Sequence, residues 1–339
     1  MSTNAVYDEF PQWFIIAETS SIFVLLLVSI ITIPLYIFEV CVIFQSRKSV
    51  FQGPFYRLIS IGMIVDLVAL INIFVGQVMP AQRVLEGFFA KFQLWVGRLY
   101  FTITYASRCV QGATAMLLSF NRVCAVVFPV LYRKLGTRNY LWTQQFIQLF
   151  GSVAAVILLA PREYIFRFEN LGWYAAMVDN QFRKRFFILV AILEVIFVFM
   201  VVVNNVTMVV AFRCKYRVRK ISSRASSLIN ERILLEKQRQ EQSMTNMTFI
   251  ICTVELTYFL FVVYTLQINQ SINKRYFYFF YNILGVVYSI FSPWLLLLFS
   301  RPITTEFAKL LRRTFRIKES KSLNVIGQPP STIALSSVS

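Results

Sequence analysis

Several charged residues lie inside long apolar stretches of this chain, where an ionised side chain is costly and therefore usually functional. Two of them are arginines, Arg108 and Arg122, and three are carboxylates, Asp66, Glu194 and Glu255. An arginine and a carboxylate at similar depth in an apolar environment can compensate each other as a hydrogen-bonded ion pair. Ion pairing and anion binding are therefore the first chemistries to consider.

Other chemistries have little support in the composition. The chain has no His, which excludes an imidazole base, a His metal ligand and a His pH switch. Its five Cys are not spaced as a metal site or a disulfide framework. No nucleophile–base pair or ligand cluster remains, so we expect no enzyme activity, no metal and no cofactor. The net charge of +18 is spread between apolar runs in no single patch, so we expect no nucleic-acid partner.

Seven apolar stretches are long enough to cross a bilayer, which requires about 20 helical residues. With 57% hydrophobic residues, the chain is typical of an integral membrane protein. The sequence predicts an all-α membrane protein, a seven-transmembrane helix bundle. The expected spans are residues 21–44, 57–79, 97–127, 141–161, 186–212, 247–268 and 276–300.

The third span carries both arginines, and we expect the other spans to pack around it. At 100° per residue, Arg108 and Arg122 fall within about 40° of the same helix face. A polar face on a membrane helix has to be covered by protein neighbours. Further polar or small residues share this face: Thr104, Gln111, Ala115 and Ser119.

The distribution of basic residues predicts that the N-terminus lies outside the cell. In that orientation the inner segments hold 22 Lys and Arg residues and the outer segments hold 10. Residues 183–185 (Arg-Lys-Arg) go against this rule. Residues 1–20 then form a short extracellular N-terminus, and they have no pattern of a cleaved signal peptide.

Two inner segments have distinctive patterns. Residues 213–246 are strongly basic, which suits either contact with anionic lipid headgroups or docking of a cytosolic partner. Residues 301–318 combine apolar and basic side chains at helical spacing, which predicts an amphipathic eighth helix in the membrane interface. Residues 319–339 are rich in Ser and are predicted to be a disordered cytoplasmic tail.

The depths of the charges suggest two ion pairs. Arg108 lies about 16 Å and Glu194 about 12 Å from the outer ends of their spans, so they can pair at the floor of an outward-facing cavity. The alternative is a purely structural pair that holds two helices together. Arg122 and Glu255 are expected at similar depth on the inner side, where they could pair at rest and separate when a partner docks. Alternatively, Arg122 extends to the inner headgroups.

Three stretches between residues 51 and 132 are distinctive: Gly53-Pro54-Phe55-Tyr56-Arg57-Leu58, Ile64-Val65-Asp66-Leu67, and Arg108-Cys109-Val110-Gln111-Gly112-Ala113-Thr114 leading to Ser119-Phe120-Asn121-Arg122. They resemble the nematode serpentine chemoreceptors of the Srg superfamily, particularly the Srv and Srg families. The end of the third span is also similar to rhodopsin-like receptors, which carry Asp/Glu-Arg-Tyr there. Asn121, Arg122, Pro129 and Tyr132 keep that spacing.

This resemblance implies a G-protein-coupled chemosensory receptor in the plasma membrane of a sensory cell. Such a receptor binds a small external molecule within the bundle and signals to a heterotrimeric G protein. We expect Arg108, Gln111 and Glu194 to bind the ligand, with Arg108 favouring an anionic group. The residues expected to act in coupling or activation are Asn121, Arg122, Pro129, Tyr132 and Glu255, and Asp66 resembles the sodium-linked aspartate of rhodopsin-like receptors.

The chain also departs from the rhodopsin-like pattern. Residues 162–185 contain no Cys, the sixth span contains no Pro, and Ser292-Pro293-Trp294 stands where Asn-Pro is usual. The alternative function is a ligand-gated channel or a carrier. A carrier predicts internal repeats and helices broken by Gly or Pro, but no repeat is found and the chain has only 11 Gly. The receptor is therefore favoured.

Overall fold

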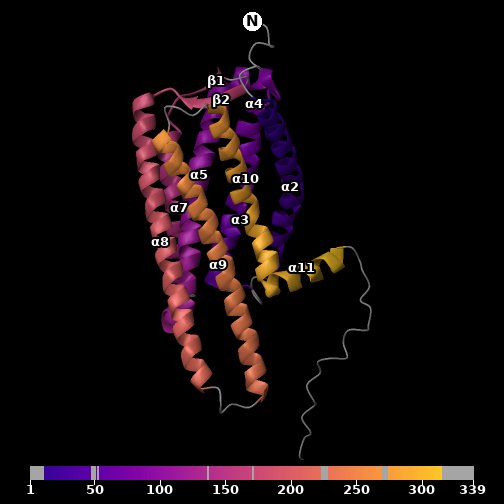
Figure 1. Cartoon of the computed structure of the whole chain (residues 1–339), viewed down its shortest axis with the longest axis vertical. Helices are drawn as coiled ribbons and strands as arrows, with labels where there is room; N and C mark the ends of the chain where they lie inside the picture. Colours follow the sequence, from indigo (N-terminus) through magenta and orange to yellow (C-terminus); the bar gives the residue numbers. More distant parts are fainter. Residues whose placement is uncertain are drawn as a thin grey trace, which may run out of the picture.

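The computed structural model describes residues 11–46, 51, 53–135, 137–169, 172–222, 228–268 and 274–314. Within these ranges, seven helices are long and apolar enough to cross a membrane. The predicted seven-helix, all-α bundle is therefore confirmed (Figure 1). The helices that contain these spans are α2 (Gln12–Gln45), α3 (Pro54–Ile73), α5 (Glu86–Val127), α7 (Arg138–Leu159), α8 (Asn180–Ser222), α9 (Leu228–Ile268) and α10 (Lys274–Phe299).

Helix α5 is the centre of the bundle, because it packs against α3, α7, α8 and α9. Helices α2 and α10 pack against each other and against α3. The polar residues of α5 are covered by these neighbours: Ser107, Arg108, Gln111, Thr114 and Ser119 are all buried. The neighbouring helices therefore cover the polar face of α5, as the sequence predicts.

Two of the connections are more ordered than the sequence indicated. Helix α3 continues through a π-helical turn, η1 (Phe74–Val78), into the short helix α4 (Met79–Ala81). Helix α5 begins at Glu86, within the connection expected before the third span, and is kinked at Phe92. A π-helical turn is the kind of local irregularity that often marks a functional position.

A β-hairpin lies across one end of the bundle, between the fourth and fifth membrane-spanning helices (Figure 1). Strands β1 (Tyr164–Glu169) and β2 (Gly172–Met177) pair antiparallel, with Tyr164 opposite Met177. The buried Tyr164 hydroxyl donates to the carbonyl of Leu159 at 2.9 Å. Burial raises the pKa of this hydroxyl to about 12, so it stays protonated and keeps the hairpin tied to the end of α7. We call this end of the bundle the hairpin end.

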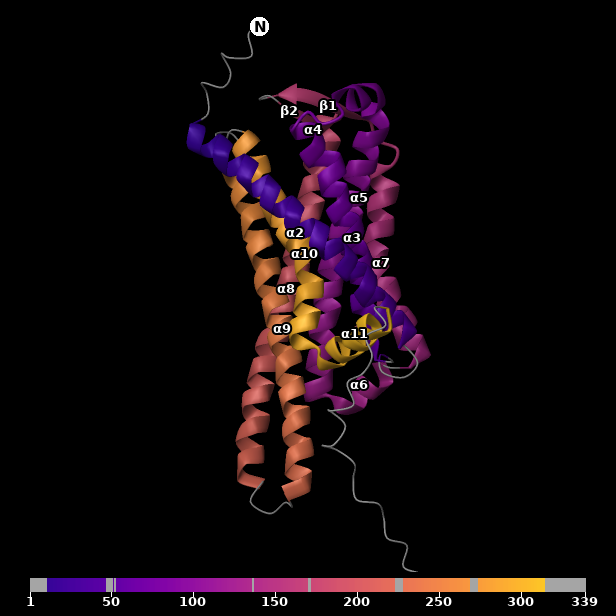
Figure 2. The same ribbon diagram turned by 90° about the vertical axis from the view of Figure 1, so that its right-hand side faces the viewer.

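Helices α8 and α9 extend beyond the other spans at the opposite end (Figure 2). Within the basic segment 213–246, the chain is helical up to Ser222 and again from Leu228; a charged helix over 225–243 leading into the sixth span is what the sequence predicts. At the same end, α11 (Arg301–Thr314) turns away from α10 and packs against α2 and α10. Helix α11 covers residues 301–314 of the amphipathic helix predicted over 301–318. The predictions for residues 1–10, 315–318 and 319–339 lie outside the described part of the chain. We call this end the α11 end.

Candidate functional site

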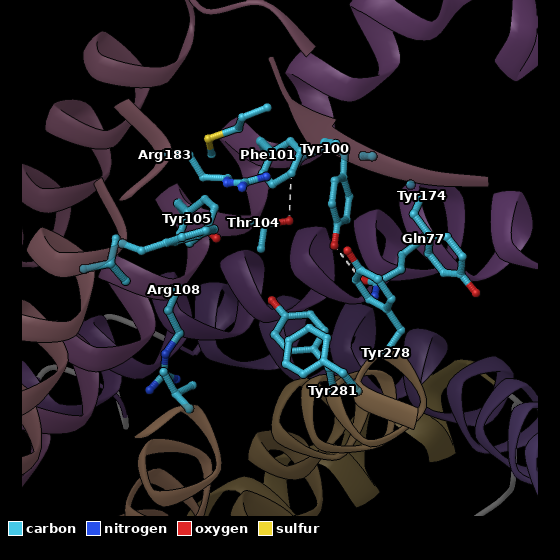
Figure 3. Close-up of a pocket in the computed structure, with 18 of the residues that line it drawn as sticks. Gln77, Tyr100, Phe101, Thr104, Tyr105, Arg108, Tyr174, Arg183, Tyr278 and Tyr281 are labelled. Atoms are coloured by element: carbon cyan, nitrogen blue, oxygen red, sulfur yellow. Dashed lines mark hydrogen bonds between the residues drawn. The ribbon is translucent and has the colours of Figure 1, made fainter. Parts of the chain in front are cut away.

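A cavity of about 760 Å³ lies in the half of the bundle nearest the hairpin (Figure 3). Its walls are formed by α5, α8, α9, α10 and the π-helical turn η1, and residues of the hairpin close it from above. Cavities that bind small molecules are typically about 300–1,000 Å³ and mostly apolar, with a few polar groups. By size and position, this cavity is the candidate site.

Six tyrosines from four elements line the cavity. Tyr174 of the hairpin stacks on Tyr278 of α10 with ring centroids 4.6 Å apart, which holds the hairpin against the bundle. Tyr100 donates from its hydroxyl to Oε1 of Gln77 at 2.5 Å, which positions η1 against α5. Such rings offer apolar faces and hydroxyl groups in the same wall. The six are Tyr100, Tyr105, Tyr174, Tyr258, Tyr278 and Tyr281.

An ionic cluster of three side chains forms the floor of the cavity. Arg108 donates from Nε and Nη2 to the two carboxylate oxygens of Glu194, at 2.6 and 2.8 Å. The same Nη2 donates to Oε1 of Glu255 at 2.6 Å. The three side chains are at most 8% exposed. One guanidinium thus joins α5 to α8 through Glu194 and to α9 through Glu255.

Two aromatic rings also contact this guanidinium. Its central carbon lies 4.2 Å from the ring centroid of Tyr258 and 4.7 Å from that of Tyr288. A guanidinium is attracted to the face of an aromatic ring, most strongly where water is excluded. Arg108 is therefore held by two carboxylates and by two tyrosine rings.

The structure brings Arg108 and Glu194 together, as their depths allowed, but it corrects the expected pairing of Glu255 with Arg122. Helix α9 packs against both α5 and α8, and this packing places Glu255 level with Arg108 instead of near the α11 end of α5. The carboxylate therefore reaches Arg108 rather than Arg122.

Gln111 does not line the cavity, in contrast to its expected place among the ligand-binding residues. It lies one helical turn below Arg108 and donates from Nε2 to Oδ1 of Asp66 at 2.8 Å. Asp66 also accepts hydrogen bonds at Oδ2 from Ser292 at 2.7 Å and from Tyr36 at 3.4 Å. Gln111 therefore compensates a buried carboxylate. The structure places Asp66 where α2, α3, α5 and α10 meet.

The residues expected to act in coupling are at the α11 end of α5. The Arg122 guanidinium lies over the ring of Phe55, 4.0 Å from its centroid. Asn121 is buried and accepts a hydrogen bond from Gln144 at 3.2 Å. Pro129 begins the short helix α6 (Pro129–Leu135), which also contains Tyr132, and proline is well suited to the first position of a helix.

Among the described residues, no group of three or more His, Cys, Asp or Glu side chains could hold a metal ion. The functional features that sequence reasoning missed are the tyrosines and the third member of the ionic floor. The tyrosines of α10 carry a signal in hindsight, because Tyr278 and Tyr281 are three residues apart and so share a helix face. The hairpin also carries a signal, because Tyr164, Ile165, Phe166 and Phe168 are aromatic or β-branched residues of the kind that favour strands.

The comparisons with known proteins agree with this architecture. A search of the curated proteins found no match. A family model described as "Serpentine type 7TM GPCR chemoreceptor Srv" matches residues 25–313. The match begins within α2 and ends within α11, so it includes all seven membrane-spanning helices and every residue of the cavity. The chain is therefore a multi-pass membrane protein that belongs to the Srv family of serpentine seven-transmembrane G-protein-coupled chemoreceptors.

Proposed function

We propose that this chemoreceptor binds a small external molecule in the tyrosine-lined cavity and signals to a heterotrimeric G protein. The hairpin end then faces outward and the α11 end faces the cytosol, as the distribution of basic residues predicts. In that orientation α11 lies in the inner membrane interface, and the receptor belongs in the plasma membrane of a sensory cell.

One observation carries the proposal: the cavity floor is connected to the two helices that project at the other end. Glu194 and Glu255 lie on α8 and α9, and these are the helices that extend past the rest of the bundle (Figure 2). Both carboxylates bind the same guanidinium of α5. A ligand that contacts this floor therefore acts on the position of α8 and α9 relative to α5.

Signalling then needs no chemistry on the ligand. A ligand that binds one arrangement of the three helices more tightly than another shifts the population toward that arrangement. The projecting ends of α8 and α9, together with the α11 end of α5 around Arg122, form the surface whose shape changes. We assign docking of the G protein to this surface, with Asn121, Arg122, Pro129 and Tyr132 in the coupling role.

The test uses cells that express the receptor with a G-protein biosensor and are exposed to pools of small odorants and metabolites. We expect the wild type to respond and Arg122→Ala, at matched surface levels, to lose the response. Arg138→Ala is the matched control, because Arg138 is exposed at the same end of the bundle. A response retained in Arg122→Ala contradicts the role of that residue, and a ligand-gated current without a G-protein signal favours the channel alternative.

A further inference from the structure

We propose that the ligand carries a protonated amine, which binds at the cavity floor beside Glu194. This inference rests on the proposed function, because it takes the cavity as the ligand site. It reverses the anion preference that Arg108 alone suggested.

The charges at the floor do not balance. The cluster contains one guanidinium and two carboxylates, and all three side chains are buried. Asp66, also buried, lies immediately below, where it accepts the hydrogen bond from Gln111. A buried charge without compensation is strongly unfavourable, so a site with excess negative charge attracts a cation. With both carboxylates ionised, the floor therefore has one negative charge more than Arg108 can neutralise.

Most of the donors of Arg108 are already used, so it has little left to offer an anion. Nε and Nη2 donate to Glu194, Nη2 also donates to Glu255, and Nη1 donates to Glu255 at 3.4 Å, which uses four of its five N–H groups. The rings of Tyr258 and Tyr288 also lie against the guanidinium. An anionic ligand would have to displace a carboxylate from a two-pronged hydrogen bond and then remain beside it. The guanidinium thus holds the two carboxylates in place, and Glu194 supplies the negative charge that a ligand can contact.

Glu194 can still accept hydrogen bonds from a ligand. Each of its oxygens takes one hydrogen bond from Arg108, whereas an ionised carboxylate offers about four acceptor positions. Of the two carboxylates, Glu194 is the one that lines the cavity. Tyr105 and Tyr281 also line the cavity and add ring faces that attract a cation. An ammonium group with an apolar body therefore matches the floor and the walls.

The mouth of the cavity has the opposite charge. Arg167, Arg183 and Lys184 line it near the hairpin, and Arg167 and Lys184 are exposed. Exposed charges are screened by salt over about 8–10 Å, so Arg167 and Lys184 weaken the attraction of the buried floor only slightly, whereas the half-buried Arg183 is screened less. The basic residues at the mouth determine which end of the ligand enters first. The ammonium group points toward the floor, and a polar or anionic group at the other end of the ligand lies near the mouth.

The test uses purified receptor in lipid nanodiscs without G protein and three probes that share one ring and chain length. These are phenethylamine, its neutral analogue 2-phenylethanol and 3-phenylpropionate. Binding is measured by the shift of the unfolding temperature and by titration calorimetry. We expect the amine to bind at least tenfold more tightly than the alcohol, and the acid to bind no better than the alcohol.

Variants identify the group responsible. Glu194→Gln should weaken amine binding at least tenfold, and it keeps a balanced Arg108–Glu255 pair, so the floor remains compensated. Glu163→Gln is the matched control, because Glu163 is an exposed acid next to the hairpin that does not line the cavity. Tighter binding of the acid, no binding of the amine up to millimolar concentration, or unchanged binding in Glu194→Gln overturns the inference.

The two proposals fail separately. If the amine binds to the purified receptor and the G-protein biosensor stays silent for every amine that binds, the signalling proposal fails and the amine inference stands. If neutral or acidic compounds activate the biosensor and the amine does not bind, the receptor proposal stands and the amine inference is wrong.

Discussion

Arg108 and Glu255 are 147 residues apart in the sequence, and their side chains meet at 2.6 Å inside the bundle. The same guanidinium binds Glu194, so three helices that are far apart in the chain share one charge cluster. Desolvating such a cluster is costly, and removing its only positive member leaves both carboxylates without compensation. The three side chains should therefore differ in how much their replacement destabilises the receptor, since only Arg108 is positive.

Replacing the arginine should destabilise the receptor more than replacing either carboxylate. Arg108→Gln leaves two buried carboxylates facing each other, and we expect a loss of about 3–5 kcal/mol in the free energy of unfolding. Glu255→Gln leaves the balanced Arg108–Glu194 pair and should cost about 1–2 kcal/mol. Thermal unfolding of the purified variants measures both.

The double variant Glu194→Gln/Glu255→Gln provides the control for this order. It leaves the guanidinium with no carboxylate, so it should be about as unstable as Arg108→Gln. If Glu255→Gln alone is as unstable as Arg108→Gln, charge balance does not govern the stability of the floor.

The hydrogen bond from Gln111 to Asp66 should be measurable as an energetic coupling. Gln111→Leu removes one donor from a buried carboxylate and should cost about 1–3 kcal/mol. In Asp66→Leu the same donor has already lost its acceptor, so adding Gln111→Leu should cost less. We expect a double-mutant cycle on unfolding stability to give a coupling of about 0.5–3 kcal/mol. Strict additivity would show that the contact does not contribute to stability.

Much of the fold could be predicted because bilayer physics restricts it. A span has to be about 20 apolar residues long, and a polar face on a span has to be covered. These two constraints predict seven helices and the central place of the helix that carries Arg108. They also place Arg108 and Glu194 at comparable depth, and the structure pairs these residues.

The remaining parts of the site depend on features that hydropathy does not encode. Depths counted from the span ends pair Glu255 with Arg122, whereas the packing of α9 against α5 brings its carboxylate to Arg108. Gln111 shares a helix face with Arg108, but the rotation of α5 against α3 directs it to Asp66. The hairpin forms through pairing between β1 and β2, which hydropathy along the chain does not reveal.

The hairpin should loosen when its stacking contact with α10 is removed. Tyr174 and Tyr278 form the stacked pair, and such pairs contribute about 0.5–1.5 kcal/mol beyond the area they bury. In Tyr174→Ala we expect backbone amides of β1 and β2 to exchange hydrogen about 2- to 12-fold faster, as measured by mass spectrometry. Tyr140→Ala, at the exposed start of α7, should leave this exchange unchanged, and equal protection of the hairpin in Tyr174→Ala would rule out the stack as its anchor.

The distance between α5 and α8 depends on the absence of a side chain at Gly112. A Cβ atom added there would lie 2.5 Å from Cδ2 of Phe197 on α8. Gly112 is one helical turn below Arg108, and Phe197 follows Glu194 by three residues. The close approach of the two helices at Gly112 thus determines whether Arg108 can bind both oxygens of Glu194. Gly112→Ala should separate the helices and lengthen these hydrogen bonds.

We expect Gly112→Ala to lower the free energy of unfolding by about 1–3 kcal/mol and to weaken amine binding at the floor. Gly87→Ala is the matched control, because a Cβ atom there meets nothing within 4 Å, and in a helix alanine is about 1 kcal/mol more favourable than glycine. Phe197→Leu combined with Gly112→Ala should restore part of both losses, because the smaller side chain leaves room for the methyl group. If the double variant recovers stability but not amine binding, the helix spacing affects the fold without positioning Glu194.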